Sequence, residues 1–174
     1  MLLPIVAVGG WLDLAFNEVQ VPWYLFPVHA YLMGVVHDVV FYFGHKALHW
    51  PALFRFHQLH HQSSGAVAAS SLYMSPLDFF VEIILPYGVF LCLIRTDLRF
   101  DVLLASLGSL LAMYEHSGYC FTTVRAFDSR MHISHHVGRL NGSFSEGVGS
   151  PGYMDLLFGT HLKDFSRFVI AAVQ

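Results

Sequence analysis

The sequence predicts an all-α membrane protein of about four transmembrane helices, arranged as two hairpins that open on one histidine-rich side. Hydrophobic residues make up 55% of the 174 residues and charged residues 12%, with a mean hydropathy of +0.54. Charged residues are roughly 25% of a typical soluble domain. Four apolar stretches are separated by short polar segments, and twelve histidines gather beside their ends. A chain of this length is expected to form a single domain over residues 1–174.

Composition also excludes several classes of protein. The nine Lys and Arg residues and the net charge of -3 leave no basic surface for a phosphate backbone, so nucleic acid is not an expected partner. Cys92 and Cys120 are too few for a disulfide framework and do not form the pairs of a zinc ribbon, so we expect free thiols.

The four apolar stretches differ in length. They cover residues 2–16, 21–44, 72–94 and 98–115. The first is short against the ~20 residues that span a bilayer, and we expect a truncated, oblique or re-entrant segment. It has no basic residues before it and no cleavage site, which argues against a signal peptide. The second is long enough to span, the third is expected to kink at Pro76 and Pro86, and the fourth is the most uniform.

Short polar turns at residues 17–20 and 95–97 join the stretches into two hairpins, whose open ends then face the same side. Basic residues are unevenly divided between the two sides. Seven lie on the histidine-rich side, namely Lys46, Arg55, Arg125, Arg130, Arg139, Lys163 and Arg167. Arg95 and Arg99 lie on the other. The positive-inside rule therefore predicts a multi-pass protein whose histidine-rich face is cytosolic.

The histidines form three motifs, 45–49 (His-x3-His), 57–61 (His-x2-His-His) and 132–136 (His-x2-His-His). Side chains three or four residues apart share one face of a helix, so each motif is expected to aim two or three imidazoles at one point. Neutral imidazole suits Fe, Zn, Cu and Ni, and this many histidines exceed the needs of one ion. We predict a two-ion centre with the ligands His45, His49, His57, His60, His61, His116, His132, His135 and His136.

Other polar residues near these motifs receive weaker assignments. Asp38 is predicted to support a ligand histidine by accepting its second ring N–H, with His37 beside it, although a simple helix-end charge stays an alternative. His29 and His161 are expected to be ordinary histidines. Cys120 is expected to be a packed thiol, and its role as a ligand stays open.

These residues resemble the fatty acid hydroxylase/sterol desaturase superfamily of membrane di-iron enzymes over roughly residues 31–160. The three histidine motifs match with their flanks, as do Ser75-Pro76-Leu77-Asp78 and a closing signature formed by Asn141 and residues 153–160. Residues 115–119 (Glu-His-Ser-Gly-Tyr) are similar to the C-4 sterol methyl oxidase branch. The chain departs from the family pattern at Lys46 (usually Arg), Asp78 (usually Glu), Cys120 (His in the fatty acid 2-hydroxylase branch) and Gly142 (usually Tyr), and it is shorter than expected before Tyr31.

The resemblance implies two iron ions, which zinc can replace, with O2 as co-substrate and electrons passed from a reductase through a cytochrome b5-type carrier. No catalytic residue is expected beyond the metal centre. The implied address is the endoplasmic reticulum membrane if the source is a eukaryote. The implied activity is hydroxylation or oxidation of a lipid, sterol-like or fatty acyl, in lipid biosynthesis.

Such a lipid is expected to enter from the bilayer between the hairpins, past Phe41, Phe79, Phe80, Leu111 and Tyr114. A desaturase on the same scaffold and a non-catalytic metal-binding membrane protein stay open as alternatives. A zinc hydrolase is weaker because the sequence lacks an H-E-x-x-H helix, and so is zinc storage or transport by a histidine-rich loop, since such loops are usually low-complexity.

Overall fold

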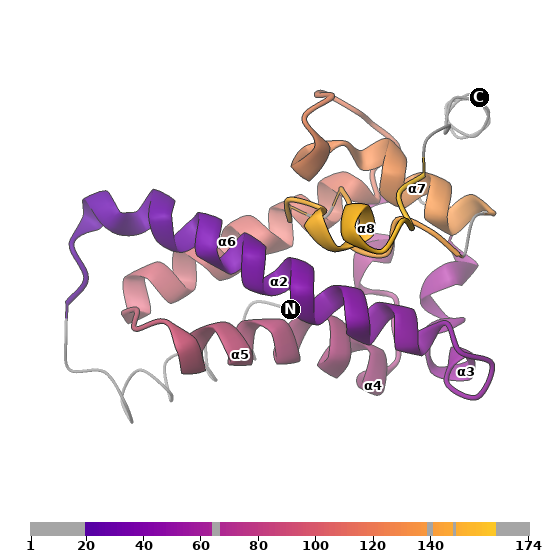
Figure 1. Cartoon of the computed structure of the whole chain (residues 1–174), viewed down its shortest axis with the longest axis horizontal. Coiled ribbons are helices and arrows are strands. Elements are labelled where there is room, and N and C mark those ends of the chain that lie inside the picture. Colours follow the sequence, from indigo (N-terminus) through magenta and orange to yellow (C-terminus); the bar gives the residue numbers. More distant parts are fainter. Residues whose placement is uncertain (1–19, 64–66, 139–140, 148, 163–174) are drawn as a thin grey trace.

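The computed structural model describes residues 20–63, 67–138, 141–147 and 149–162, which form helices and loops without a strand. The elements are η1 (Trp23–Leu25), α2 (Phe26–Leu48), α3 (Phe54–His57), η2 (His60–Gln62), η3 (Ala68–Leu72), α4 (Pro76–Phe79), η4 (Phe80–Ile84), α5 (Leu85–Leu93), α6 (Leu98–Glu115), η5 (Arg125–Phe127), α7 (Ser129–Val137) and α8 (Tyr153–Leu157). Three of these, α2, α5 and α6, form an elongated bundle, and α3, α4, α7 and α8 gather at one of its ends (Figure 1).

The bundle is held together by apolar side chains between its long helices. The buried cluster comprises Tyr87 and Phe90 of α5 with Leu104 and Ala105 of α6, and side chains of α2 such as Phe26 and Met33 pack against it. Its far end is closed by Asp97, whose carboxylate accepts hydrogen bonds from the backbone N–H groups of Arg99 and Phe100 at the start of α6. Asp97 also accepts from the N–H of Val21 at 2.9 Å, which ties the segment before α2 to the turn before α6.

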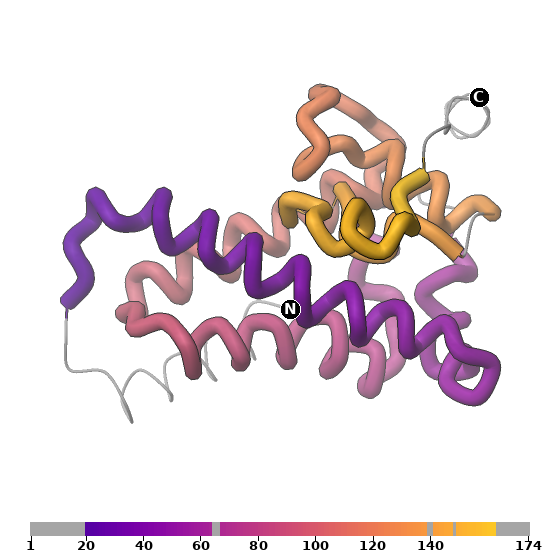
Figure 2. The backbone as a smooth tube through the Cα atoms, in the orientation of Figure 1, coloured from indigo at the N-terminus to yellow at the C-terminus, as the bar shows by residue number. Residues whose placement is uncertain are grey.

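The helix over residues 76–93 is continuous through α4, η4 and α5 (Figure 2). We predicted kinks at Pro76 and Pro86, but the helix accommodates each proline in another way. Pro76 begins the helix behind the N-cap Ser75, where a missing N–H costs nothing. Pro86 is the second residue of α5, just after the π-helical turn η4, whose i→i+5 hydrogen bonds replace the ladder that a proline would interrupt.

Two helical stretches among the described residues are long and apolar enough to cross a membrane, residues 23–48 and 76–93. The predicted stretch 98–115 forms α6, which contains Arg99, Asp101 and Glu115 and is not one of the two. The predicted stretch 2–16 lies outside the described residues, as does most of the turn 17–20. A helical, membrane-associated fold is thus supported.

The surface of the bundle is rich in exposed apolar side chains, and one of its ends buries polar ones. Large apolar side chains exposed along the long helices include Val28, Val39, Phe43, Leu85, Leu93, Val102, Leu103, Leu107 and Leu110. Buried side chains at the end formed by α3, α4, α7 and α8 are mostly histidine, serine and carboxylates. Extended apolar surface of this kind marks contact with lipid or with another protein.

Candidate metal centre

All nine predicted ligand histidines come together at one end of the bundle, in two adjacent clusters. The first cluster contains His45, His49, His57, His61 and His135, and the second contains His60, His116, His132 and His136. Within each cluster the nitrogen atoms able to bind a metal lie within 4.8 Å of one another. The clusters touch where the rings of His61 and His136 stack, with centroids 4.4 Å apart.

The two His-x2-His-His motifs are each divided between the clusters. His57 and His61, one helical turn apart, enter the first cluster, whereas His60 enters the second. In α7 the division is reversed, because His132 and His136 enter the second cluster and His135 the first. The expectation that one motif aims at one point was therefore wrong. Residues i and i+4 share a face, and residue i+3 is rotated far enough to reach the neighbouring cluster.

Hydrogen bonds fix the orientation of the rings in the first cluster. His45 donates from Nδ1 to the carbonyl oxygen of Phe144 at 2.6 Å, and His135 donates from Nδ1 to that of Gly142 at 2.8 Å. A carbonyl only accepts, so Nδ1 carries the proton and Nε2 presents its lone pair. The two Nε2 atoms nevertheless lie 3.1 Å apart. Facing lone pairs at this distance repel, and a cation between them turns both into ligands, so the cluster fits a metal ion.

A carboxylate orients the ring of His57, although it is not the one predicted. Asp78 accepts from His57 Nδ1 at 2.9 Å, the contact that we expected of Asp38. Asp38 instead binds the hydroxyl of Ser145 at 2.5 Å and the backbone N–H groups of Tyr153 and Met154. It thus fixes the start of α8 and the loop 141–147. Its neighbour His37 stacks on Phe41, with centroids 4.7 Å apart, on the same helix.

The closing loop supplies residues that the sequence did not single out for this role. Asp155 accepts from the backbone N–H groups of Phe144 and Ser145 at 2.9 and 2.7 Å, which holds the Phe144 carbonyl toward His45. At Gly142 a Cβ atom would lie 2.7 Å from the carbonyl oxygen of Thr160. The family's usual tyrosine therefore has no room here, and the glycine lets its own carbonyl reach His135. In the sequence, the only sign of this role was the departure from the family's usual tyrosine at position 142.

The clustered histidines that lie outside the long helices have lowered pKa values, which favours their neutral form. Burial lowers the pKa of His49 to about 2, with further lowering by His135 and His57. Burial likewise lowers the pKa of His116 to about 4, and it holds the pKa of His132 well below its usual value, with the neighbouring histidines adding to the effect. A neutral ring is the form that binds a metal.

The residues predicted to lie outside the centre do so. His29 contacts the carbonyl oxygens of Leu25 and Arg95 at the other end of the bundle. His161 donates to the carboxylate of Glu146 at 2.7 Å. The thiol of Cys120 lies within hydrogen-bond distance of two acceptors, the Thr122 carbonyl at 3.2 Å and Asp128 Oδ1 at 3.5 Å. These contacts agree with a packed thiol.

The side chains expected at a lipid entrance do not act as one group. Phe41 is buried and its ring meets that of His45 edge-on, with centroids 5.0 Å apart. Phe80 is 49% exposed on the surface of η4, and Tyr114 stacks on Phe121 in the segment after α6. A surface depression is lined by Cys120, Phe121, Thr122, Thr123 and Arg130.

Comparison with known proteins agrees with this geometry. The chain is 27% identical over 140 residues to fatty acid hydroxylase ahd1 of Mycosarcoma maydis, covering 80% of this chain and 34% of that protein. It is 26% identical over 154 residues to the human fatty acid hydroxylase domain-containing protein 2, covering 85% and 44%. It is 33% identical over 95 residues to methylsterol monooxygenase erg25B of Aspergillus fumigatus, covering 50% and 31%. The matched part of the chain therefore covers less than half of the length of each of these relatives.

No solved structure matches the chain significantly. The fatty acid hydroxylase family model, however, matches residues 30–160. This range is most of the chain and contains all nine clustered histidines, Asp78 and the closing loop. The chain therefore belongs to the fatty acid hydroxylase family.

Proposed function

We propose that this chain is the metal-binding domain of a membrane di-iron oxidoreductase that hydroxylates or oxidises a lipid, either a sterol or a fatty acyl chain. O2 is the co-substrate, and electrons come from a reductase through a cytochrome b5-type carrier. The observation that carries the proposal is the pair of adjacent histidine clusters in which buried lone pairs face one another. The relatives named as a fatty acid hydroxylase and a methylsterol monooxygenase support the reaction class.

In this proposal the first cluster holds one iron ion and the second holds the other. The two ions supply the oxygen activation that cleavage of an unreactive C–H bond requires. The protein's own contribution is to orient and shield the ligands. Carbonyl groups fix the rings of His45 and His135, and Asp78 fixes that of His57. These three contacts turn the Nε2 atoms of His45, His135 and His57 toward the first cluster.

Exclusion of water is the second contribution of the chain. The side chains of His45, His57 and His135 have no exposed surface. The ring of Phe144, itself 4% exposed, lies within 5.7 Å of the rings of both His45 and His135. A dry centre protects a reactive oxidant from unproductive reaction with solvent.

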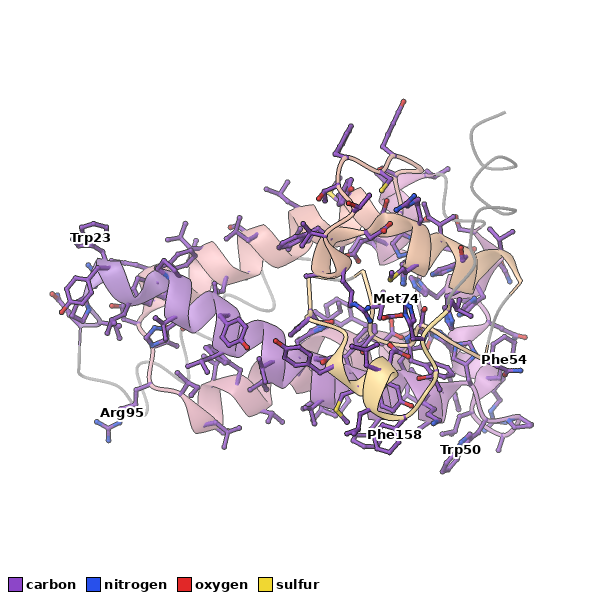
Figure 3. The ribbon with its side chains drawn as sticks, turned by 45° about the horizontal axis from the view of Figure 1, so that its top comes forward. Trp23, Trp50, Phe54, Met74, Arg95 and Phe158 are labelled. Carbon is purple, nitrogen blue, oxygen red and sulfur yellow. The ribbon has the colours of Figure 1, made fainter. Side chains whose placement is uncertain are left out.

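We further propose a multi-pass topology of four spans with the metal centre on the cytosolic side, in the endoplasmic reticulum if the source is a eukaryote. Trp23 and Arg95 lie at one end of the bundle, and Trp50, Phe54 and Phe158 lie at the other, beside the centre (Figure 3). Tryptophan near both ends of a long apolar helix is typical of the two membrane interfaces. The exposed apolar side chains between these ends support the same arrangement.

The test is lipid mass spectrometry on membranes that contain the chain, supplied with ¹⁸O2, reductase and cytochrome b5. The matched control is the double variant His60→Ala/His135→Ala, which removes one ligand from each cluster. Label in a lipid that appears only with the intact histidines would support a monooxygenase and identify its substrate. A new double bond without label would instead support a desaturase. Absence of both product and bound metal would contradict the proposal and favour a non-catalytic protein.

A further inference from the structure

Lys46 follows the predicted ligand His45 on α2, and its ammonium group lies among aromatic rings. The Nζ atom lies 5.1, 5.6 and 5.8 Å from the ring centroids of Tyr42, Phe158 and Phe144, in that order. A cation within about 6 Å of a ring centroid is attracted by the quadrupole of the ring. Three such rings hold this ammonium group between α2 and the closing part of the chain.

A series of hydrogen bonds leads from the ammonium group to Asp155. The Nζ atom donates to the hydroxyl of Tyr42 at 3.0 Å, and that hydroxyl lies 3.2 Å from Oγ1 of Thr160. Thr160 in turn donates from Oγ1 to Oδ1 of Asp155 at 2.6 Å. An ammonium group only donates and a carboxylate only accepts, so the two ends set the direction of every bond. Tyr42 therefore donates to Thr160, and two hydroxyl groups join the cation to the carboxylate.

Asp155 lacks a nearer cation. Its side chain is fully buried, and among the described residues no lysine, arginine or histidine forms a direct ion pair with it. The hydroxyl of Ser145, 3.0 Å from Asp155, lies closer to a second carboxylate, Asp38, at 2.5 Å. A buried carboxylate costs free energy unless it is paired and hydrogen-bonded. Lys46 is the cation that the series of hydrogen bonds brings to it.

The other end of the series reaches His45 through a single peptide group. The Oδ2 atom of Asp155 accepts from the N–H of Ser145 at 2.7 Å. The carbonyl of that same peptide group belongs to Phe144, and it accepts from Nδ1 of His45 at 2.6 Å. Hydrogen bonds in series polarise one another, so the carboxylate at the N–H makes the carbonyl oxygen a stronger acceptor. A stronger acceptor behind a ligand histidine fixes its ring and raises its basicity.

We infer that Lys46 is a positioning residue of the first cluster, and that it acts on His45 through four groups in series: Tyr42, Thr160, Asp155 and the peptide group 144–145. This inference rests on the proposed function and adds a device that adjusts one of its two metal sites. None of the four groups hydrogen-bonds to a histidine of the second cluster. The ion of the first cluster is therefore the one that responds to Lys46.

The experiment uses the full chain in detergent micelles loaded with Co²⁺, whose visible absorption reports the strength of its ligands. Chelator competition is compared for the wild type, Lys46→Met, which removes the cation, and Thr160→Val, which removes the hydroxyl at nearly constant shape. Lys46→Arg and Thr160→Ser are the matched controls, because each keeps its hydrogen-bond donor.

We expect two Co²⁺ per wild-type chain. Lys46→Met and Thr160→Val should each release one Co²⁺ at about 10-fold lower chelator concentration, with a smaller effect on the other. The absorption of the weakened ion should move to longer wavelength, because a less basic imidazole is a weaker ligand. Lys46→Arg and Thr160→Ser should match the wild type.

A double variant, Lys46→Met/Thr160→Val, distinguishes this series from ordinary packing. Groups that act in series lose their effect together, so the double variant should lose no more affinity than either single variant. Two independent packing defects would instead add their effects, and they would leave the absorption of bound Co²⁺ unchanged.

Three results would overturn the inference: wild-type affinity and spectrum in Lys46→Met, losses that add in the double variant, or a Thr160→Ser chain that loses as much affinity as Thr160→Val. The two Thr160 variants decide the matter if Lys46→Met does not fold. In each case the proposed function would stand, because the wild-type chain binds two ions. A wild-type chain that binds no metal would refute this inference and the proposed function together.

Discussion

Replacing Gly142 with alanine tests whether the closing loop tunes the first cluster. The new Cβ atom would lie 2.7 Å from the carbonyl oxygen of Thr160 and 2.8 Å from Cδ2 of Leu162. Ordinary van der Waals contact begins near 3.4 Å, so the loop must retreat by about 0.7 Å. The loop cannot yield freely, because the N–H of Ser143 already binds the same Thr160 oxygen at 2.8 Å.

The expected cost has two parts. Overpacking of this kind destabilises a protein by about 1–3 kcal/mol. The displacement also moves the Gly142 carbonyl away from His135 Nδ1, and loss of such a supporting contact typically lowers metal affinity about 10- to 100-fold. Only the first cluster uses His135, so the second ion should be retained.

Chelator competition on the metal-loaded protein in micelles measures this effect. We expect biphasic metal loss from Gly142→Ala, with one ion leaving at about 10- to 100-fold lower chelator concentration than in the wild type. Gly88→Ala is the matched control, since its Cβ atom would meet nothing within 4 Å. Wild-type affinity for both ions in Gly142→Ala, or equal weakening of both ions, would refute the reasoning.

Three further predictions concern single side chains. Asp78→Asn should weaken metal binding about 10-fold or more in the same competition assay, because His57 Nδ1 loses its carboxylate; unchanged affinity would contradict the role given to Asp78. Asp97 has a pKa lowered to about 2, mainly by its hydrogen bond to Arg99, so its stabilisation is complete above pH 4 and lost as the pH falls toward 2. The melting temperature of Asp97→Asn should therefore lie below that of the wild type at pH 7, by an amount equivalent to about 0.3–1 kcal/mol for the lost charge at the helix N-terminus, with the gap closing near pH 2; a constant gap would disprove this assignment. Cys120→Ser should bind both ions normally, since its thiol contacts Thr122 and Asp128; a lost ion would show that Cys120 is a ligand.

The sequence predicted which histidines come together, because their three- and four-residue spacings constrain them to helix faces. It did not predict how they divide, since the assignment of His60 and His135 to opposite clusters depends on where the short helices sit. The rule that a carboxylate in an apolar stretch is functional was applied to Asp38 and not to Asp78, which binds His57. That rule identifies an unusual residue, but only the packing of the helices decides which carboxylate reaches the histidines.

Composition and hydropathy predicted the helical, membrane-like character of the fold. The span count depends on residues 2–16, which lie outside the described structure, and on α6, whose three charged residues weaken its hydropathy. Gly142 shows a different kind of limit. A glycine in place of a tyrosine reads as a departure from the family, yet in three dimensions it is the residue that allows a carbonyl to reach His135.

The crossed assignment of the two His-x2-His-His motifs has a thermodynamic consequence. The segment 57–61 and helix α7 each contribute histidines to both clusters, so an ion bound in one cluster would also position histidines of the other. Binding of one ion would therefore order part of both segments and reduce the conformational entropy lost when the other ion binds. By linkage, each ion raises the affinity for its neighbour by the same factor. A variant that loses one ion is therefore expected to hold the other less tightly than the fully loaded wild type does.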